Sequence, residues 1–203
     1  MDSWSLVIFL RRSCDEIEIM IKPLPIVLYP DPLLKKRSRA VTAEEFKAGR
    51  AGEVKLQELV ERMTVSMYEA EGLGLAAPQV GVLLRLWIAD PTEERQQPIV
   101  VFNPVLSEEA GSIEKEEGCL SIPEARAKVK RIERVVITGC GLAGQPIQIE
   151  AEDLLSRVAQ HETDHLDGVL FINRIGLAAR FLLRGKLKQL EEEYEVLQRR
   201  KKK

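Results

Sequence analysis

Residues 153–167 read DLLSRVAQHETDHLD, and Gly168 follows them. The segment predicts a helix that ends at the glycine, because glycine readily adopts the left-handed conformation found at helix C-termini. His161 and His165 are the only two histidines of the 203-residue chain, and both lie in this segment. Residues four apart share one face of a helix, with Cβ atoms about 5–6 Å apart, so the two imidazoles can bind one cation.

Glu162 lies beside this pair and completes a His-Glu-x-x-His pattern, which is typical of metal-dependent hydrolases. A divalent metal lowers the pKa of a bound water from about 15.7 to about 7, and Glu162 can take the proton of that water. A chance match between surface or core histidines is the alternative. The chain places both of its histidines in one predicted helix, which favours the metal site.

A catalytic metal site of this kind needs three protein ligands and one open position. The candidates for the third ligand are Cys119, Cys140, Cys14 and a downstream carboxylate. Cys119 lies in Glu117-Gly118-Cys119-Leu120-Ser121, which follows a charged loop. The glycine permits close approach of the backbone, and an amide that follows a ligand can point at a reacting oxygen. Cys140 lies in a predicted hairpin and suits a core position, whereas Cys14 lies near the N-terminus.

Hydrophobic periodicity and turn residues predict the other elements. Thr42 and Glu45 form a capping box ahead of a helix. Asn103-Pro104 is expected to end one of the strands. Helices are expected over 53–70 and 177–200, strands over 83–89 and 99–102, and a hairpin from 135–138 and 147–149. Helices and strands do not alternate regularly in this order, so the sequence predicts an α+β fold.

The composition fits one soluble globular domain, with 45% hydrophobic and 31% charged residues. The net charge of −2 predicts no broad attraction to DNA or to a membrane surface. The apolar run at 6–10 is far shorter than the roughly 20 residues of a membrane span. The three cysteines form no small disulfide framework, which favours a reducing, cytoplasmic setting. We divide the chain into a non-catalytic N-terminal extension (1–19), a catalytic domain (20–176) and a C-terminal helix with a basic tail (177–203).

Three stretches together resemble the three signatures of the peptide deformylase family, in the order of that family. They are Gly72-Leu73-Gly74-Leu75-Ala76-Ala77-Pro78-Gln79, Glu117-Gly118-Cys119-Leu120-Ser121 and Gln160-His161-Glu162-Thr163-Asp164-His165. Weaker likeness extends over residues 21–175. The resemblance implies antiparallel and mixed sheets around a central metal-binding helix, with a helix at the C-terminus. It also implies that the chain removes the formyl group from the N-terminal methionine of newly made polypeptides and releases formate.

The resemblance assigns roles to individual residues. Glu162 would be the acid/base, and Gln79 together with the backbone N–H of Leu120 would stabilise the oxyanion. Losing one such donor commonly lowers turnover by a factor on the order of 10²–10³. The metal ligands would be Cys119, His161 and His165, with water in the fourth position.

Four further residues are expected to contact the substrate. Gly72 and Gly74 would leave room for a peptide alongside a strand edge. Val158 and Leu154 lie three and seven positions before His161, on the metal-facing side of the helix, and the family likeness favours Val158 as part of a methionine pocket. Arg126 resembles a position near the peptide-binding groove. The alternatives are an ordinary core position for Val158 and a solvated surface charge for Arg126.

The resemblance favours Fe²⁺ as the native metal, although Zn²⁺, Ni²⁺ or Co²⁺ also suit one thiolate with two imidazoles. The expected partners are N-formyl-methionyl nascent peptides. Residues 199–203 form a basic tail after an acidic run at 191–195. This tail is either a solvated helix end, where cations suit the helix dipole, or a contact for ribosomal RNA.

Two other interpretations use the same helix. A zinc endoprotease would take its third ligand from a downstream carboxylate or histidine, but the sequence has no histidine after His165. A closed structural site would use Cys140 as a fourth ligand and would leave no position for water.

Overall fold

The computed structural model describes residues 21–92, 94–95 and 97–201. The expectations for the N-terminal extension and for Cys14 therefore concern residues outside the described part, as do those for the last two residues of the basic tail.

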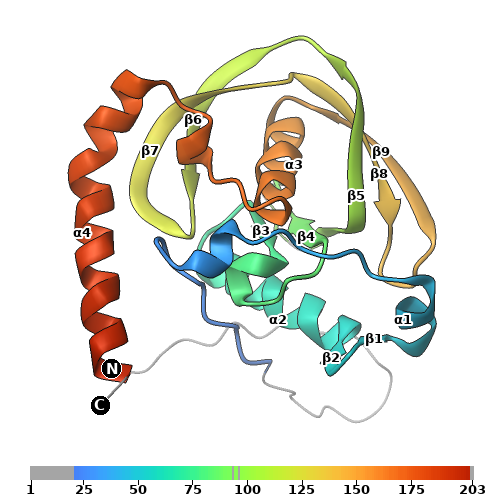
Figure 1. Ribbon diagram of the computed structural model, residues 1–203. Coiled ribbons are helices and arrows are strands. Elements are labelled where there is room, and N and C mark those ends of the chain that lie inside the picture. The colour runs from blue at the N-terminus through green and yellow to red at the C-terminus, as the bar shows by residue number, and fades with distance from the viewer. Residues whose placement is uncertain (1–20, 93, 96, 202–203) are drawn as a thin grey trace.

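A five-stranded antiparallel sheet with the strand order β3-β4-β5-β8-β9 forms the centre of the fold. Its longer strands curve around one helix, α3 (Asp153–Leu166), which packs against β3, β4, β8 and β9 (Figure 1). The strands are β3 (Gly74–Ala76), β4 (Leu86–Ala89), β5 (Ile99–Ala110), β8 (Arg134–Cys140) and β9 (Pro146–Glu152). The predicted helix at 153–167 and the predicted hairpin are thus present, and the glycine after the helix, Gly168, has a φ of 73°.

The strand predicted to stop at Asn103-Pro104 in fact continues to Ala110, so this prediction was wrong. The pairing of β5 with β8 shifts register between Phe102 and Val105, and Asn103 has a φ of 49°. The Asn103 side chain exchanges two hydrogen bonds with the backbone of Val41, at 2.9 and 2.7 Å. Proline, which lacks an N–H, is tolerated at such a bulge.

The expected charged loop before Cys119 is a strand, so this prediction was also wrong. β6 (Ile113–Cys119) pairs with β7 (Ile122–Arg131) across a two-residue turn. Glu114 lies opposite Lys130 and Glu116 lies opposite Lys128. Opposite charges stabilise the pair on its exposed face, whereas the other face of β7 buries Ile122, Ala125 and Val129 in the core.

The elements before the sheet follow the prediction with shifted boundaries. α1 (Ala43–Ala48) has the expected capping box. α2 (Leu56–Glu69) begins three residues later than predicted, because β1 (Arg50–Ala51) and β2 (Val54–Lys55) form a short hairpin before it. Single-turn 3-10 helices complete the chain at η1 (Pro32–Lys35), η2 (Ala77–Val80) and η3 (Phe171–Asn173).

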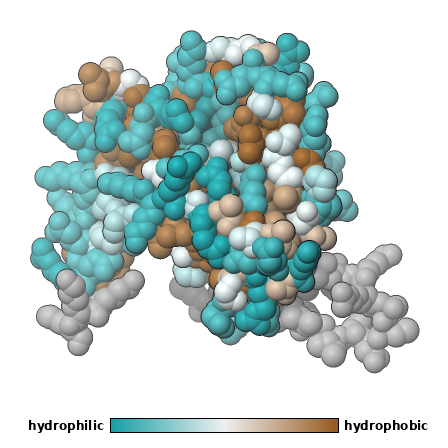
Figure 2. All heavy atoms as spheres, turned by 45° about the vertical axis from the view of Figure 1, so that its right-hand side comes forward, coloured by the Kyte–Doolittle hydropathy of each residue, from teal (hydrophilic) through white to brown (hydrophobic). Residues whose placement is uncertain are grey.

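The core has three parts, and one of them buries α3 against the sheet with Trp87, Val101 and Ile137. The C-terminal helix α4 (Leu177–Lys201) packs against β7 and buries Leu187 and Leu190. Its start stays exposed, and hydrophobic side chains gather there in Figure 2; the exposed apolar residues in this region are Leu177, Phe181 and Leu182. The order and packing of these elements confirm the predicted α+β fold with a central helix.

None of the helices in the described part of the chain combines the length and the apolar composition needed to span a membrane.

Candidate active site

Cys119, His161 and His165 converge although the cysteine lies more than 40 positions before the histidines. One ligand atom from each of the three residues lies within 4.8 Å of the others. The Sγ of Cys119 is 3.2 Å from Nε2 of His165. Both histidines are buried, and Cys119 is partly buried at the end of β6. One thiolate and two imidazoles at this spacing fit a borderline divalent metal such as zinc or ferrous iron.

Cys140 does not belong to this group in the described structure. It lies at the end of β8 opposite Pro146 and packs against the core cluster that contains Phe102. Cys140 therefore occupies the core position that its sequence context favoured.

Glu117 orients the ring of His161. Its Oε2 is 3.2 Å from Nδ1 of His161, which leaves Nε2 free for a metal. The buried Arg131 donates two hydrogen bonds of 3.0 Å to the same carboxylate and one of 2.6 Å to Asp164. Burial raises the pKa of Glu117, but hydrogen bonds from His161 and Arg131 outweigh it and lower the pKa to about 2. Glu117 is therefore an ionised acceptor at neutral pH.

Sequence reasoning missed Glu117, Arg131 and Asp164 as residues of the site. Glu117 lies inside the second motif and Asp164 lies between the two histidines, so position could have suggested both. Arg131 carried no such signal, since it joins the site only through the pairing of β6 with β7.

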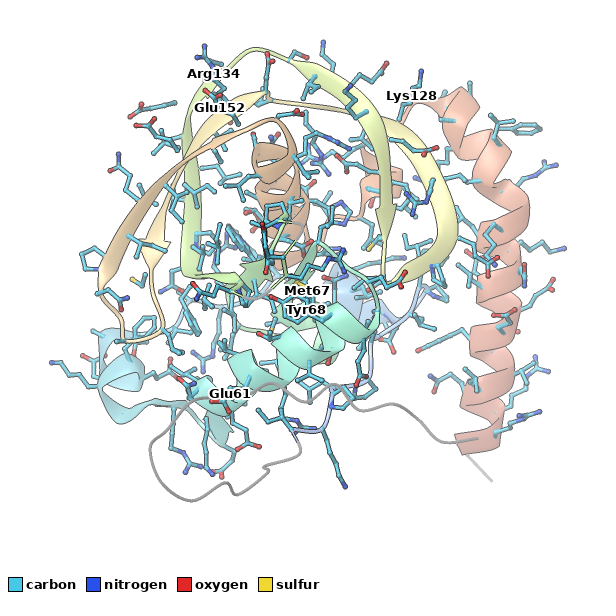
Figure 3. All side chains as sticks on the ribbon, turned by 180° about the vertical axis from the view of Figure 1, so that it is seen from behind. Glu61, Met67, Tyr68, Lys128, Arg134 and Glu152 are labelled. Atoms are coloured by element: carbon cyan, nitrogen blue, oxygen red, sulfur yellow. The ribbon has the colours of Figure 1, made fainter. Side chains whose placement is uncertain are left out.

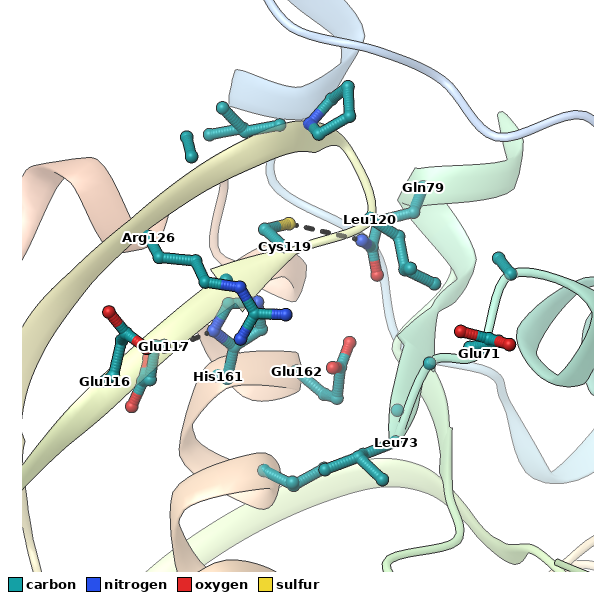
Figure 4. Close-up of a pocket in the computed structure, with 18 of the residues that line it drawn as sticks. Glu71, Leu73, Gln79, Glu116, Glu117, Cys119, Leu120, Arg126, His161 and Glu162 are labelled. Carbon is teal, nitrogen blue, oxygen red and sulfur yellow. Dashed lines mark hydrogen bonds and ion pairs between the residues drawn. The ribbon is translucent and has the colours of Figure 1, made fainter. Parts of the chain in front are cut away.

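Glu162 is buried next to the histidines, and Figure 4 shows its carboxylate pointing into the pocket. Its Oε2 has no hydrogen-bond partner among the described residues. Burial raises the pKa of Glu162 to about 7, although the charge of His161 acts in the opposite direction. A carboxyl group with a pKa near neutrality can both accept and return a proton.

Gln79 and Leu120 lie on the other side of Cys119 (Figure 4). The Gln79 Oε1 accepts a 2.8 Å hydrogen bond from the N–H of Ala76, which turns its Nε2 toward the site. This Nε2 lies 3.6 Å from the Cys119 Sγ and 3.2 Å from the Ser121 Oγ. Leu120 lies in the turn between β6 and β7, and its N–H has no hydrogen-bond partner in the described part of the chain. Two donors thus flank the predicted metal position.

Gly72 and Gly74 have a steric role that the sequence did not reveal. A Cβ on Gly74 would lie 2.6 Å from Glu162 Oε1 and 2.8 Å from Val158 Cγ1. A Cβ on Gly72 would lie 2.7 Å from Leu120 Cδ1. The glycines therefore make room for side chains of the site itself. β3 is also the edge strand of the sheet, so the backbone there stays open on one side, as a bound peptide would require.

A pocket of about 570 Å³, here called the active pocket, opens onto these residues. Leu73, Leu154 and Val158 provide apolar parts of its lining. The side chain of Arg126 packs over Gly118, where a Cβ would lie 3.5 Å from the Arg126 Cγ, and it reaches across the opening in Figure 4. Val158 and Arg126 thus both border the active pocket.

Comparison with known proteins gives the family. Residues 23–180 match the family model of polypeptide deformylase. The chain is 47% identical over 167 residues to a peptide deformylase of Thermodesulfovibrio yellowstonii, covering 81% of this chain and 96% of that protein. The chain belongs to the polypeptide deformylase family. A peptide deformylase of Acidobacterium capsulatum is 44% identical over 169 residues, covering 82% of this chain and 95% of the relative.

Solved deformylase structures have the same fold. The crystal structure of a peptide deformylase from Legionella pneumophila superposes with a TM-score of 0.75 at 36% identity, covering 85% of this chain and 98% of that one. The crystal structure of the peptide deformylase from Thermus thermophilus superposes with a TM-score of 0.74 at 38% identity, covering 84% of this chain and 98% of that one. The resemblance stated from the three motifs is confirmed, and the endoprotease interpretation was wrong. The protein is a metal-dependent hydrolase that removes the N-terminal formyl group from nascent peptides.

Proposed function

We propose that this deformylase works through a ferrous ion held by Cys119, His161 and His165, with Glu162 as its acid/base. The observation that carries the proposal is the convergence of the three ligand atoms within 4.8 Å beside a buried carboxylate. A divalent cation in this position supplies Lewis acidity, which lowers the pKa of water to about 7.

Glu162 moves the proton. Its buried carboxylate can take a proton from the attacking water and deliver it to the departing amine of methionine. The formyl carbon is attacked, its bond to the amide nitrogen breaks, and formate and a free N-terminal amine result. The unpartnered Oε2 of Glu162 is the oxygen available for this transfer.

Gln79 and Leu120 stabilise the oxygen of the formyl group as it gains negative charge. Gln79 and Leu120 lie on the same side of Cys119, the Gln79 Nε2 is 3.6 Å from the Cys119 Sγ, and the Leu120 N–H has no partner among the described residues. Donors fixed before the reaction cost no reorganisation during it. Val158 and Leu154 hold the methionine side chain, and Arg126 borders the peptide where it leaves the active pocket.

The choice of ferrous ion rests on the family likeness and on the ligand set. One thiolate and two imidazoles also suit zinc, nickel and cobalt, and zinc has the higher intrinsic affinity. We expect activity to be sensitive to oxygen, since both a ferrous ion and the Cys119 thiolate are open to oxidation. Aerobically purified protein that keeps full activity with only zinc bound would contradict the ferrous assignment.

The decisive experiment measures formate release from formyl-Met-Ala by protein loaded anaerobically with Fe²⁺. Glu162→Gln is expected to keep its metal and lose at least about 10²-fold in turnover. Cys119→Ser is expected to lose metal affinity as well as activity. A fully active Glu162→Gln variant would remove the proposed acid/base, and metal content measured beside activity separates the two roles.

The compartment and the ribosome contact are part of the same proposal. A reduced Cys119 and nascent substrates both favour the cytoplasm as the site of action. Residues 199–203 would attach the helix end to ribosomal RNA by charge. Co-sedimentation with ribosomes at low salt tests this, and a chain without residues 199–203 that binds equally well would rule the contact out.

A further inference from the structure

The helix α4 carries exposed apolar side chains on the face that is turned away from the sheets, here called the outward face. α4 lies along the outside of the molecule and packs against β7 with its other face (Figure 1). On the outward face the exposed fractions are 89% for Leu177, 63% for Phe181 and 83% for Leu182. Val196, near the other end of the helix, is 47% exposed. Apolar side chains gathered on an exposed surface commonly mark a site of interaction.

Helical spacing brings these side chains to one side of α4. Phe181 follows Leu177 by four residues, and Val196 follows Leu182 by about four turns. The buried residues of the same helix, such as Leu187, contact the core from the opposite side. The outward face therefore has an apolar contact near each end of the helix.

The charges of α4 are divided between its two halves. Residues 177–190 include four basic residues and no acidic one, whereas residues 191–195 include four glutamates. The Arg184 Cζ lies 4.5 Å from the centre of the Phe181 ring, so this positive charge borders the apolar side chains. Glu195 is eleven residues after Arg184, about three turns, and lies on the same side of the helix.

The outward face is complementary to itself when a second helix runs in the opposite direction. With Gln189 at the centre of an antiparallel pair, Leu182 of one copy lies opposite Val196 of the other. Arg184 of one copy then lies next to Glu195 of the other, and the basic half of each helix faces the acidic half of its neighbour. Opposite charges placed in this way favour one partner and one orientation.

We infer that the outward face of α4 is a self-association surface, at which two copies of the chain pair through antiparallel α4 helices. Such a pair has two-fold symmetry, so each favourable contact occurs twice. The glutamates at 191–195 would repel a nucleic acid or an anionic lipid surface lying along the helix, which favours a second copy as the partner. The inference does not depend on the proposed function, because no residue of α4 lines the active pocket.

Sedimentation velocity over a concentration series tests the inference. The native protein is expected to shift from monomer to dimer between about 1 and 100 μM. The association should weaken in 0.5 M salt, which screens the charges. Leu182→Asp should raise the dissociation constant at least about 10-fold, because it places a carboxylate from each copy in the apolar contact. Leu182 is exposed, so this substitution should leave the folded monomer intact, which circular dichroism checks.

Charge reversal gives a second test. Arg184→Glu and Glu195→Arg should each raise the dissociation constant about 5- to 10-fold, because each variant places like charges together in the pair. An equimolar mixture of the two variants should associate as tightly as the native protein, since each supplies the charge that the other has lost. A role of either residue within its own helix would not produce this recovery.

The matched controls reverse an ion pair on another part of the surface. Arg134 and Glu152 are exposed, their Nη1 and Oε1 atoms are 3.8 Å apart, and they lie far from α4 (Figure 3). Arg134→Glu and Glu152→Arg change the net charge by the same amounts as the test variants and should self-associate like the native protein.

Three outcomes would overturn the inference. The first is a native protein that stays monomeric up to about 100 μM. The second is a mixture of the Arg184→Glu and Glu195→Arg variants that associates no better than either variant alone. The third is a monomer that binds anionic lipid vesicles through Leu182, which would assign the outward face to a membrane surface instead.

Discussion

The Oε2 of Glu117 lies 3.2 Å from Nδ1 of His161, and buried Arg131 donates two hydrogen bonds to the same carboxylate. This contact fixes the proton of the imidazole on Nδ1 and turns the lone pair of Nε2 toward Cys119 and His165. Partners of this kind orient a ligand and raise its basicity. The orientation of His161 therefore depends on the negative charge of Glu117, a residue that does not itself bind the metal, and Arg131 holds this carboxylate in place.

Replacing Glu117 should weaken metal binding. In Glu117→Gln the ring of His161 loses a charged acceptor, and we expect metal affinity to fall by about 10- to 100-fold. Competition with a chelator, followed by metal analysis, measures the change. Glu114→Gln is the control, because Glu114 is exposed on the same strand and faces Lys130. Equal metal affinity of Glu117→Gln and Glu114→Gln would show that the contact does not orient the ligand.

Gly74 should tolerate no side chain. The Cβ of Gly74→Ala would lie 2.6 Å from Glu162 Oε1, which forces the carboxylate to move. We expect turnover to fall by a factor on the order of 10² while the metal stays bound, since displacement of about 1 Å costs that much. Gly185→Ala is the contrasting variant, because a Cβ there meets nothing within 4 Å and the position lies in α4. It should stabilise the protein by about 1 kcal/mol without changing turnover. A Gly74→Ala enzyme of normal turnover would show that Glu162 adapts freely.

Local patterns predicted the helix and its pair of histidines, because four-residue spacing fixes a shared face without knowledge of the rest of the chain. The position of Cys119 beside them came from resemblance, since no local pattern relates residues more than 40 positions apart. β6 escaped prediction because its sequence is mostly charged, with Glu114 opposite Lys130. β7 does alternate, with buried Ala125 and Val129 between exposed charged residues, and this signal was missed. Arg131 could not be assigned to the site from local pattern, because only the strand pairing brings it next to Glu117. The bulge at Asn103 depends on its bonds to Val41, about 60 positions away.

Ionisation of Tyr29 should lower the free energy of unfolding of the protein at alkaline pH. Burial and a 2.6 Å hydrogen bond to Glu191 raise the pKa of Tyr29 to about 12, against about 10 in an unfolded chain. The folded state therefore holds the phenol proton more tightly. The stabilisation that the protonated Tyr29 gives the folded state is fully present below about pH 10 and is lost as the pH rises from about 10 to about 12.

The measurement is urea unfolding of the native protein and of Tyr29→Phe at pH 8 and pH 11. At pH 8 the variant should be less stable by about 1 kcal/mol, the usual net value of a hydrogen bond. At pH 11 this difference should be smaller, since the native phenol favours the unfolded state once it ionises. A difference that stays constant over this range would mean that Tyr29 does not titrate with unfolding.

The packing of α4 bears on whether residues 177–203 form a part separate from the catalytic domain. Leu190 is 4% exposed and belongs to the core cluster that contains Tyr29 and Ile122, whereas Leu197 on the same helix is 50% exposed. Ile122 also lines the active pocket, so this cluster joins the helix to the site.

We expect Leu190→Ala to cost about 2–5 kcal/mol in the free energy of unfolding, because it leaves a cavity between α4 and β7. Leu197→Ala should cost less than about 0.5 kcal/mol. If urea unfolding showed the two variants to be equally stable, α4 would contribute little to the core and the division at residue 177 would hold. A loss confined to Leu190→Ala, within a single unfolding transition, would make α4 part of the catalytic unit.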